Sequence, residues 1–214
     1  MTAVSVANQL VATAGGGQIS MSWGGSEFSL ETLSNYDGLF TRPGVVYFAA
    51  AGDSPGVEWP STSPNVVSVG GTSISRNSGT GLFQREVTWQ SGGGGPSVYE
   101  TRPSYQFAIS TTVGGQRGTP DVAADANPSS GVWVYYSPYW YILGGTSVAT
   151  AVWAGIVNSA RHFYTATEEF RTLYADQGAN PITMGSCGPN QGYLAGGVWN
   201  FCTGLGSPLG ESGK

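Results

Sequence analysis

Two polar residues, a serine and an aspartate, follow glycines at predicted ends of secondary-structure elements, where their side chains could take part in acyl transfer. Ser147 follows the run Gly-Gly-Thr at 144–146, between an apolar segment and the strongest helix pattern in the chain. A serine at a helix N-terminus lies beside free backbone N–H groups and the positive end of the helix dipole, which together can hold a developing oxyanion. A helix cap in a glycine-rich turn explains the same pattern. The motif by itself leaves both interpretations open.

Asp53 follows Gly52 at the end of the apolar run at residues 45–51. Such a run is typical of a strand buried on both faces, as in a parallel sheet covered by helices. Ligands of open α/β sheets bind at the carboxyl-terminal edge of the strands, so the run delivers Asp53 to a candidate ligand site. The alternative is that Asp53 simply forms a turn.

The surrounding pattern predicts an α/β fold. Helices are expected at residues 4–14, 29–36 and 147–163, and extended segments at 18–23, 45–51, 66–69, 120–125, 132–136 and 139–143. Strands that alternate with helices indicate a mainly parallel sheet flanked by helices. Residues 76–118 are polar and glycine-rich, and we expect them to form a long loop at a functional rim.

The composition narrows the class of protein. The chain has 214 residues, 40% of them hydrophobic and 10% charged, which fits a single domain over residues 1–214. Thirteen acidic against eight basic residues give a net charge of -5, so neither nucleic acid nor a membrane is an expected partner. Sparse charge and a pI near 4.7 suit a protein that works in acid. No apolar run approaches the ~20 residues of a membrane span.

The opening residues are expected to form a helix rather than a signal peptide. They lack the basic start and the solid apolar core of a secretion signal, although an Ala-Thr-Ala triplet stands at 12–14. If the protein is secreted, its signal therefore lies outside this chain.

Six segments carry a resemblance to a known family. They are SMSWGG (20–25), FAAAGDS (48–54), WPSTSPNVVSVGGTS (59–73), TPDVAADANPSSG (119–131), GGTSVATAVWAG (144–155) and CTGLGSPLG (202–210). In this order they resemble the sedolisin family of serine-carboxyl peptidases, which has a subtilisin-like fold. The resemblance covers nearly the whole chain from Gln18 onward, and it rests on the six blocks together more than on any single one.

The resemblance implies a role for each matching residue. Ser147 would be the catalytic nucleophile, and Asp53 would match the oxyanion-hole aspartate of the family. An aspartate donates a hydrogen bond to an oxyanion only when it is protonated, which gives such enzymes a physical reason to prefer acid. Ser22, Trp23 and Gly24 match the segment that pairs with an extended peptide or protein substrate through backbone hydrogen bonds.

The family's general base has no counterpart in this chain. Sedolisins carry a glutamate, with an aspartate four residues later, on a helix well before the segment that matches residues 20–25, and residues 1–17 hold neither acid. We therefore expect an N-terminally truncated, partial catalytic domain. Its exposed sheet edge would pair with a missing N-terminal half or form a homodimer. His162 lies fifteen residues, ~22 Å along one helix, from Ser147, so we expect it at a helix end rather than in catalysis.

The family's calcium site also departs from its pattern. The first aspartate ligand matches Pro181, beside Ile182, and the second matches Asn200. A glycine that gives a carbonyl oxygen in the family is Val198 here. Since calcium takes six to eight oxygens that include carboxylates, we expect a degenerate site and no required cofactor.

Two cysteines, Cys187 and Cys202, bracket this region, as in some family members that close the loop with a disulfide. A disulfide across a ~15-residue loop stabilises by roughly 3 kcal/mol. It would fit a secreted, extracellular protein, and two buried thiols are the alternative.

Three functions remain open at this point. The first is an acid-acting serine endopeptidase, impaired as an isolated chain, or a slow serine-dependent esterase in which Asp53 is the nearest base. The second is a pseudoenzyme that binds extended peptides without turnover. The third is a fragment with no function of its own. Whether the chain is an enzyme depends on the missing general base, because the loss of a general base lowers the catalytic rate by ~10²–10⁴-fold or more.

Overall fold

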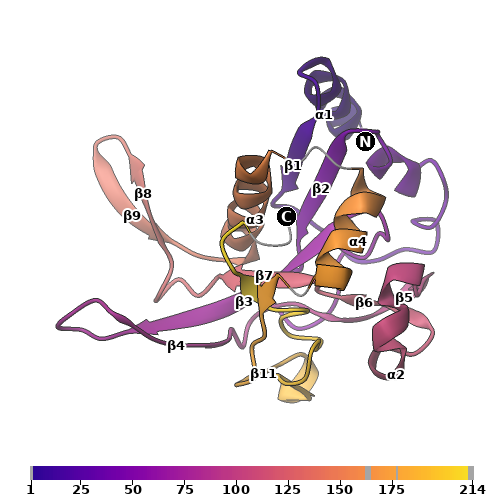
Figure 1. Cartoon of the computed structure of the whole chain (residues 1–214). Helices are drawn as coiled ribbons and strands as arrows, with labels where there is room; N and C mark the ends of the chain where they lie inside the picture. Colours follow the sequence, from indigo (N-terminus) through magenta and orange to yellow (C-terminus); the bar gives the residue numbers. More distant parts are fainter. Residues whose placement is uncertain (1, 162–164, 177, 212–214) are drawn as a thin grey trace.

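A five-stranded sheet forms the centre of the computed structural model, which describes residues 2–161, 165–176 and 178–211 (Figure 1). The strands are β1 (Gly17–Met21), β2 (Val45–Ala50), β3 (Val67–Arg76), β4 (Phe83–Thr88) and β7 (Val122–Asp125). The order is β1-β2-β3-β4, with β7 also paired to β3. Only β4 runs antiparallel, along the outer part of β3, and the other pairs are parallel. The predicted mainly parallel sheet flanked by helices is confirmed.

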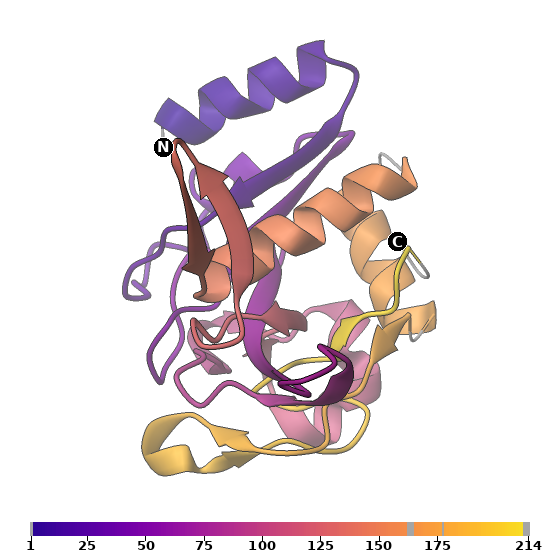
Figure 2. The same cartoon turned by 90° about the vertical axis from the view of Figure 1, so that its left-hand side faces the viewer.

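Helices cover both faces of this sheet. α1 (Thr2–Thr13) lies against β1 and β2, close to the predicted range 4–14. α3 (Thr146–Ala160) packs across β1, β2, β3 and β7, and α4 (Ala166–Asp176) contacts β2 (Figures 1 and 2). None of the helices in the described ranges has the length and apolar character needed to cross a membrane.

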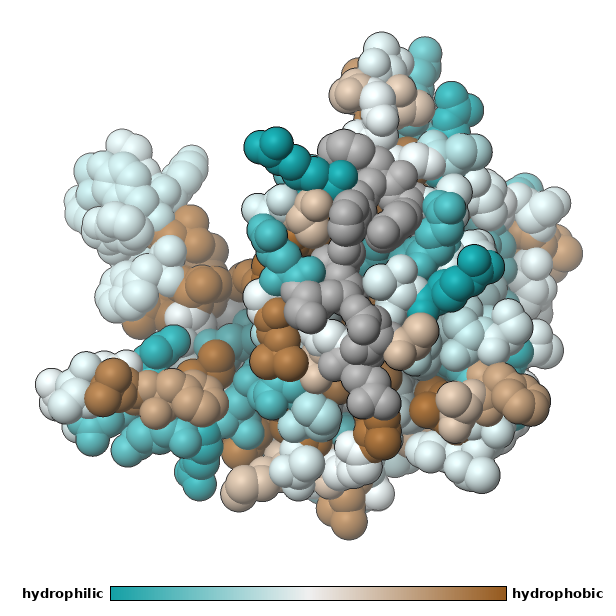
Figure 3. All heavy atoms as spheres, viewed as in Figure 1, coloured by the Kyte–Doolittle hydropathy of each residue, from teal (hydrophilic) through white to brown (hydrophobic). Residues whose placement is uncertain are grey.

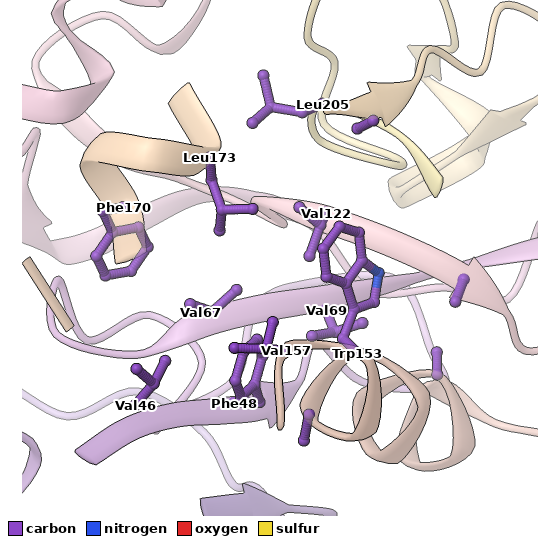
Figure 4. Packing of buried hydrophobic residues seen from close by; sticks show 14 of the residues in the cluster. Val46, Phe48, Val67, Val69, Val122, Trp153, Val157, Phe170, Leu173 and Leu205 are labelled. Atoms are coloured by element: carbon purple, nitrogen blue, oxygen red, sulfur yellow. The ribbon is translucent and has the colours of Figure 1, made fainter. Parts of the chain in front are cut away.

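The apolar run of β2 is buried because each face meets a different cluster. Val46 and Phe48 pack with Trp153 of α3 on one face (Figure 4). Tyr47 packs with Phe40 on the opposite face, in the cluster that includes α1. Each fully buried side chain of this size contributes about 1.5–3 kcal/mol, so β2 is anchored from both sides. Its carboxyl end, which carries the candidate aspartate, is correspondingly fixed.

The predicted long loop at residues 76–118 is wrong, because much of this region forms short elements. They are β4, β5 (Gly95–Thr101), η2 (Ser104–Ile109), α2 (Ser110–Val113) and β6 (Gln116–Thr119), with β5 antiparallel to β6. In β5 the apolar Val98 and Tyr99 are exposed whereas Ser97 and Glu100 are buried, and β4 begins with the exposed Phe83, so the sequence shows little of the apolar periodicity that identifies a strand.

The short helix predicted at residues 29–36 is also wrong. These residues form turns, followed by the 3₁₀ helix η1 (Asp37–Phe40). Glu31 is buried, and its carboxylate accepts a hydrogen bond from Phe28 N at 2.8 Å.

An exposed hairpin precedes α3. β8 (Val132–Tyr136) and β9 (Tyr139–Leu143) pair with each other and stand away from the sheet (Figures 1 and 2). All ten strand residues are exposed, and the hairpin projects from the molecular surface (Figure 3). The two predicted extended segments are therefore confirmed, although their apolar side chains lie outside the core.

A buried ion pair holds the start of β7. The guanidinium of Arg117 contacts both carboxylate oxygens of Asp121, and both side chains are fully buried. Asp121 also accepts hydrogen bonds from Ser68 N at 2.8 Å and from the Tyr174 hydroxyl at 2.7 Å. The pair thus links β3, β6 and α4 at the start of β7.

Candidate active site

The nucleophile candidate lies at the start of α3. Ser147 is the second residue of this helix, and Gly145 precedes the helix with a φ of 94°. A Cβ atom at Gly145 would lie 2.7 Å from Asp53 Oδ2, so glycine is needed for both the backbone conformation and the close approach. Ser147 is half-buried, with its side chain at the positive end of the helix dipole.

The carboxylate of Asp53 meets the same helix end. β2 ends at Ala50, and the chain turns through Gly52 so that Asp53 faces α3. Asp53 Oδ1 accepts hydrogen bonds from Thr146 N at 2.7 Å and from Thr146 Oγ1 at 2.8 Å. Thr146 Oγ1 in turn accepts a hydrogen bond from Gly52 N at 3.2 Å. These bonds fix Asp53 beside Ser147 and leave Oδ2 as the oxygen that can carry a proton.

The third predicted segment closes the site from β1. The ladder between β1 and β2 ends at Met21, so Ser22, Trp23 and Gly24 continue past the sheet. Ser22 Oγ donates a hydrogen bond to the carbonyl oxygen of Ser147 at 3.0 Å. The segment predicted as a substrate strand therefore lies against the start of α3.

These residues line one cavity of about 170 Å³ at the carboxyl ends of β1 and β2. Its wall is formed by Ser22, Trp23, Gly24, Ala50, Gly52, Asp53, Glu58, Thr146 and Ser147. A larger hollow of about 610 Å³ lies elsewhere, between α1 and residues 38–43, and contains no acidic side chain. The smaller cavity is the candidate active site, because the nucleophile and the carboxyl group meet there.

Glu58 is a member of this cavity that the sequence patterns did not single out. Its carboxyl group lies against the backbone of Gly24 and Gly52, where added Cβ atoms would lie 2.6 Å from Oε2 and 3.1 Å from Oε1. Burial, and then the charge of Asp53, raise the pKa of Glu58 above its usual value. A carboxylate five residues after Asp53 was the available signal, but spacing in a turn-rich segment does not say where a side chain points.

No side chain in the described part of the chain is positioned to take a proton from Ser147. Its hydroxyl makes no hydrogen bond to a carboxylate there, and His162, which we expected at a helix end, lies outside the described residues. The structure thus places the candidate nucleophile Ser147 near the carboxyl group of Asp53, without a candidate general base in contact among the described residues.

A second group of acids lies in the segment before β2 and on β5, and hydrogen bonds join Glu31 to Thr62 and Asp37 to Ser63 in the segment after β2. This acid cluster consists of Glu27, Glu31, Asp37 and Glu100; Glu31 and Glu100 are almost fully buried. Burial raises the pKa of Glu31 to about 7; a hydrogen bond from Phe28 N opposes this increase, and the nearby Glu27 adds to it.

Glu100 has the largest shift in the acid cluster. Burial, followed by the charges of Asp37 and Glu31, raises its pKa to about 8. Glu100 shares a hydrogen bond with Asp37, and its Oε1 atom has no hydrogen-bond partner among the described residues. The acid cluster is therefore most compatible with the fold when its buried carboxyl groups are protonated.

The predicted disulfide is confirmed in the structure. Cys187 and Cys202 are bonded, with a Cα–Cα distance of 5.6 Å. The bond joins the strand β11 (Ser186–Cys187) to the turn that follows Asn200. It closes the loop that contains Val198 and Asn200, two residues of the candidate calcium region.

The residues of that region do not fit a calcium ion. Asn200 Nδ2 points its N–H groups at the carbonyl oxygens of Ile182 and Gly196, at 3.4 and 3.5 Å. Asn200 Oδ1 accepts hydrogen bonds from Cys202 N and Thr203 N, both at 3.0 Å. An amide donor thus faces the carbonyls that a cation would need, whereas calcium requires carboxylate and carbonyl oxygens that converge. Val198 adds no acidic ligand, and no acidic or histidine cluster suited to a metal occurs among the described residues.

The mainly parallel sheet covered by helices, with Ser147 at the start of α3 and Asp53 beyond the carboxyl end of β2, is typical of a subtilisin-like α/β fold. Comparison with the sequences of known proteins supports this fold. Sedolisin from Pseudomonas sp. (strain 101) is 35% identical over 179 residues, which cover 73% of this chain and 29% of that protein. Kumamolisin from Bacillus sp. (strain MN-32) is 31% identical over 226 aligned positions, covering 90% and 41% respectively. The chain belongs to the sedolisin family.

Solved structures give the same result. The chain superimposes on a Pseudomonas sedolisin (serine-carboxyl proteinase), complexed with two molecules of pseudo-iodotyrostatin, with a TM-score of 0.77 and 28% identity. This match covers 94% of this chain and 65% of that one. An S41 psychrophilic protease, at 20% identity and a TM-score of 0.65, shows the shared fold alone. No protein-family model matches the chain. The chain spans less than half the length of the curated relatives it matches.

Proposed function

We propose that the chain carries the nucleophile and oxyanion side of an acid-acting serine peptidase. One observation supports this most strongly: Asp53 is held by two hydrogen bonds from Thr146 at the start of the helix that presents Ser147. The arrangement joins residues 93 and 94 positions apart in sequence, so local turn chemistry does not account for it.

The chemistry assigned to each residue follows from this geometry. Ser147 Oγ attacks a carbonyl carbon, its proton passes to a general base that none of the described side chains supplies, and the carbonyl oxygen becomes a negatively charged oxyanion. Asp53, with a proton on Oδ2, donates a hydrogen bond to that oxyanion while Oδ1 keeps its bonds to Thr146. A carboxyl group donates this hydrogen bond only in its protonated form, so we propose that the activity belongs to acidic solution.

The substrate we propose is an extended peptide or protein segment. Residues 22–24 continue past the end of the β1–β2 ladder, and Ser22 ties this segment to the carbonyl of Ser147. A peptide added along it would present a carbonyl to the start of α3. The disulfide between Cys187 and Cys202 supports an extracellular location, because such bonds persist in oxidising compartments.

A second candidate function is peptide binding without efficient turnover. The observation in its favour is that no described side chain accepts the proton of Ser147. The 214-residue chain would then cleave activated esters slowly and amides hardly at all, because an ester has a better leaving group and depends less on a general acid.

Hydrolysis of matched ester and peptide substrates tests the proposal. We expect p-nitrophenyl ester hydrolysis by the wild-type chain between pH 3 and 7, highest at the acidic end and abolished in Ser147→Ala. Asp53→Asn should remove the fall in rate with rising pH, because an amide donates at every pH in this range.

The outcomes separate the two functions. Peptide cleavage that disappears in Ser147→Ala supports a peptidase, whereas ester hydrolysis with peptide binding but no peptide cleavage supports the binding function. Ester hydrolysis that persists unchanged in Ser147→Ala would contradict the role of Ser147 in both.

A further inference from the structure

The hairpin formed by β8 and β9 carries an apolar surface that the body of the molecule leaves exposed. All ten strand residues are exposed, and the hairpin projects away from the central sheet (Figures 2 and 3). Six of these residues are aromatic and 44–75% exposed: Trp133, Tyr135, Tyr136, Tyr139, Trp140 and Tyr141. Single exposed apolar residues are ordinary on a protein surface, whereas a contiguous group of this size marks an interaction surface.

The hairpin stands over a hollow rather than over the packed core. This hollow has a volume of about 500 Å³, and it is lined by Val132 and Trp133 of β8 together with Ile74 of β3 and Val152 of α3, among others. A two-stranded hairpin is marginally stable in water unless further strands or an apolar surface cover one of its faces. The hairpin should therefore gain stability when another surface packs against it.

The base of the hairpin is fixed to the rest of the chain. A Cβ atom at Gly144 would lie 2.5 Å from Pro128 N, and Gly145 N donates a hydrogen bond to the carbonyl oxygen of Ala126 at 2.6 Å. This close approach leaves little freedom where the hairpin joins α3. Every copy of the chain therefore presents the hairpin in the same orientation, as a symmetric interface requires.

The register of the two strands gathers aromatic rings on each face. Trp133 pairs with Ile142 and Tyr135 pairs with Trp140, so these four side chains share one face. The ring centroids of Tyr135 and Trp140 lie 5.2 Å apart, with the rings tilted by 54°. Tilted rings leave spaces that the edges of other aromatic rings can fill, because aromatic pairs favour edge-to-face contacts. The face is therefore suited to packing against a second face of the same kind.

The charge pattern favours a second copy over an anionic partner. Residues 132–143 contain no charged side chain, although the chain as a whole has a net charge of -5. Two copies can therefore meet through the hairpins without placing like charges opposite one another. An anionic lipid surface would instead be repelled, and the hairpin lacks the lysine and arginine residues that bind such surfaces.

The exposed area matches what a stable dimer buries. At about 200 Å² for each aromatic side chain, the six rings present roughly 700 Å² to solvent. The four aliphatic residues of the strands are 38–44% exposed, and they raise the total to at least about the 800 Å² per partner of a standard interface.

We propose that the β8–β9 hairpin is the surface through which two copies of this chain form a symmetric dimer. The same patch on each copy contacts the other, so that the two projecting hairpins pack together around a two-fold axis. This interface differs from pairing along the exposed sheet edge, which the sequence pattern suggested. It is also independent of the peptidase function proposed above, because none of the hairpin residues, all of which the structure describes, lines the candidate active-site cavity.

Sedimentation velocity of the 214-residue chain tests the proposal. The wild type should change from a monomer of 22.2 kDa to a particle of twice that mass as its concentration rises from about 1 to about 100 µM. A variant with Trp133→Thr and Trp140→Thr keeps residue types that favour strands but loses the two largest exposed rings. Its dissociation constant should be at least about 100-fold higher.

A matched variant controls for the loss of exposed apolar surface as such. Phe107→Thr combined with Leu194→Thr removes two side chains that are 73% and 74% exposed and lie outside the hairpin. This variant should dimerise like the wild type, and circular dichroism should show that both variants are folded.

Hydrogen exchange locates the interface without any substitution. In the wild type, the backbone amides of residues 132–143 should exchange at least about fivefold more slowly at high than at low concentration, whereas those of β1 should not change. This measurement decides the location of the interface even if a variant fails to fold.

Three results would overturn the proposal. The first is a wild-type chain that remains monomeric at about 100 µM. The second is a dimer that persists in the variant with Trp133→Thr and Trp140→Thr, or protection that appears along β1 in place of the hairpin. The third is binding of a monomeric wild type to neutral phosphatidylcholine vesicles that the hairpin variant loses, because the hairpin would then contact lipid rather than a second copy.

Discussion

The acid cluster predicts that the protein loses stability as the solution becomes neutral. Glu31 and Glu100 are almost completely removed from water, and Glu100 Oε1 has no hydrogen-bond partner in the described structure. Glu100 faces the carboxyl groups of Asp37, Glu31 and Glu27, and the main influences on its pKa are burial and these acids, with no basic side chain among them. Ionisation therefore places like charges in a buried site.

The direction of the change in stability follows from comparing the pKa of each glutamate in the folded chain with its pKa in the unfolded chain. Below the usual value of 4.5, both glutamates are protonated in the folded and the unfolded chain, and stability is fully present. Between 4.5 and about 8 the unfolded chain ionises first, so stability is lost as pH rises through the folded pKa values of about 7 and about 8. Burial shifts the pKa of Asp37 in the same direction.

The expected loss is large compared with the total stability of a domain. A pKa raised from 4.5 to about 7 corresponds to about 3 kcal/mol, and one raised to about 8 to about 5 kcal/mol. Domains of this size have stabilities of about 5–15 kcal/mol. We therefore expect the free energy of unfolding to fall by at least about 3 kcal/mol between pH 4 and pH 8.

Urea unfolding at constant ionic strength measures this loss directly. The wild-type chain, Glu100→Gln and the exposed control Glu211→Gln would be compared from pH 4 to pH 8. The amide of Glu100→Gln keeps the shape of the side chain without ionising, so its stability should fall by less than half as much as that of the wild type. A flat wild-type profile, or an unchanged slope in Glu100→Gln, would refute the reasoning.

Three further predictions concern stability. Arg117→Met should lower the free energy of unfolding by about 3–5 kcal/mol in urea titrations, because it leaves the buried carboxylate of Asp121 unpaired; a loss below about 1 kcal/mol would contradict the importance of the pair. Replacing Cys187 and Cys202 with serine should cost about 3 kcal/mol for a loop with a sequence separation of 15, and thiol titration of the unreduced, denatured wild type should find no free thiol. EDTA should leave the melting temperature within about 2 °C, because the amide of Asn200 faces the carbonyls that a calcium ion would need; a larger decrease would indicate bound metal.

The sequence predicted the elements whose signal is local. The apolar run that becomes β2 predicts a doubly covered strand, and the glycines before Ser147 predict a tight turn into a helix. β2 and α3 are each identified from local signals, and β2 ends where α3 begins, at one edge of the sheet. The family resemblance could therefore be used to propose Asp53 and Ser147 as partners. The structure adds the contact itself, through Thr146.

The sequence did not predict features that depend on contacts between distant segments. Glu58 is one carboxylate in a turn, and its place in the cavity depends on the close approach of Gly24, 34 positions earlier. The acid cluster joins residues 27–37 to Glu100, and no periodic pattern relates them. The outer part of β4 is exposed and combines Phe83 with the polar Gln84 and Arg85, so its strand signal was too weak to recognise.

The exposed hairpin illustrates a further limit of sequence patterns. Residues 132–136 and 139–143 have the apolar and aromatic content of core strands, yet all of them are exposed in the structure. Composition therefore identified the strands correctly but did not show whether their side chains are buried or exposed.

Covalent labelling of the nucleophile tests the central claim most directly. The wild-type chain would be incubated with p-nitrophenyl acetate at pH 4, quenched in acid, digested and analysed by mass spectrometry. We predict an acetyl group on Ser147, absent in Ser147→Ala and formed about 10²-fold more slowly in Asp53→Ala, which lacks the oxyanion donor. Acetylation at other residues with Ser147 unmodified, or an equal rate in Asp53→Ala, would contradict the assignment of these two residues as nucleophile and oxyanion donor.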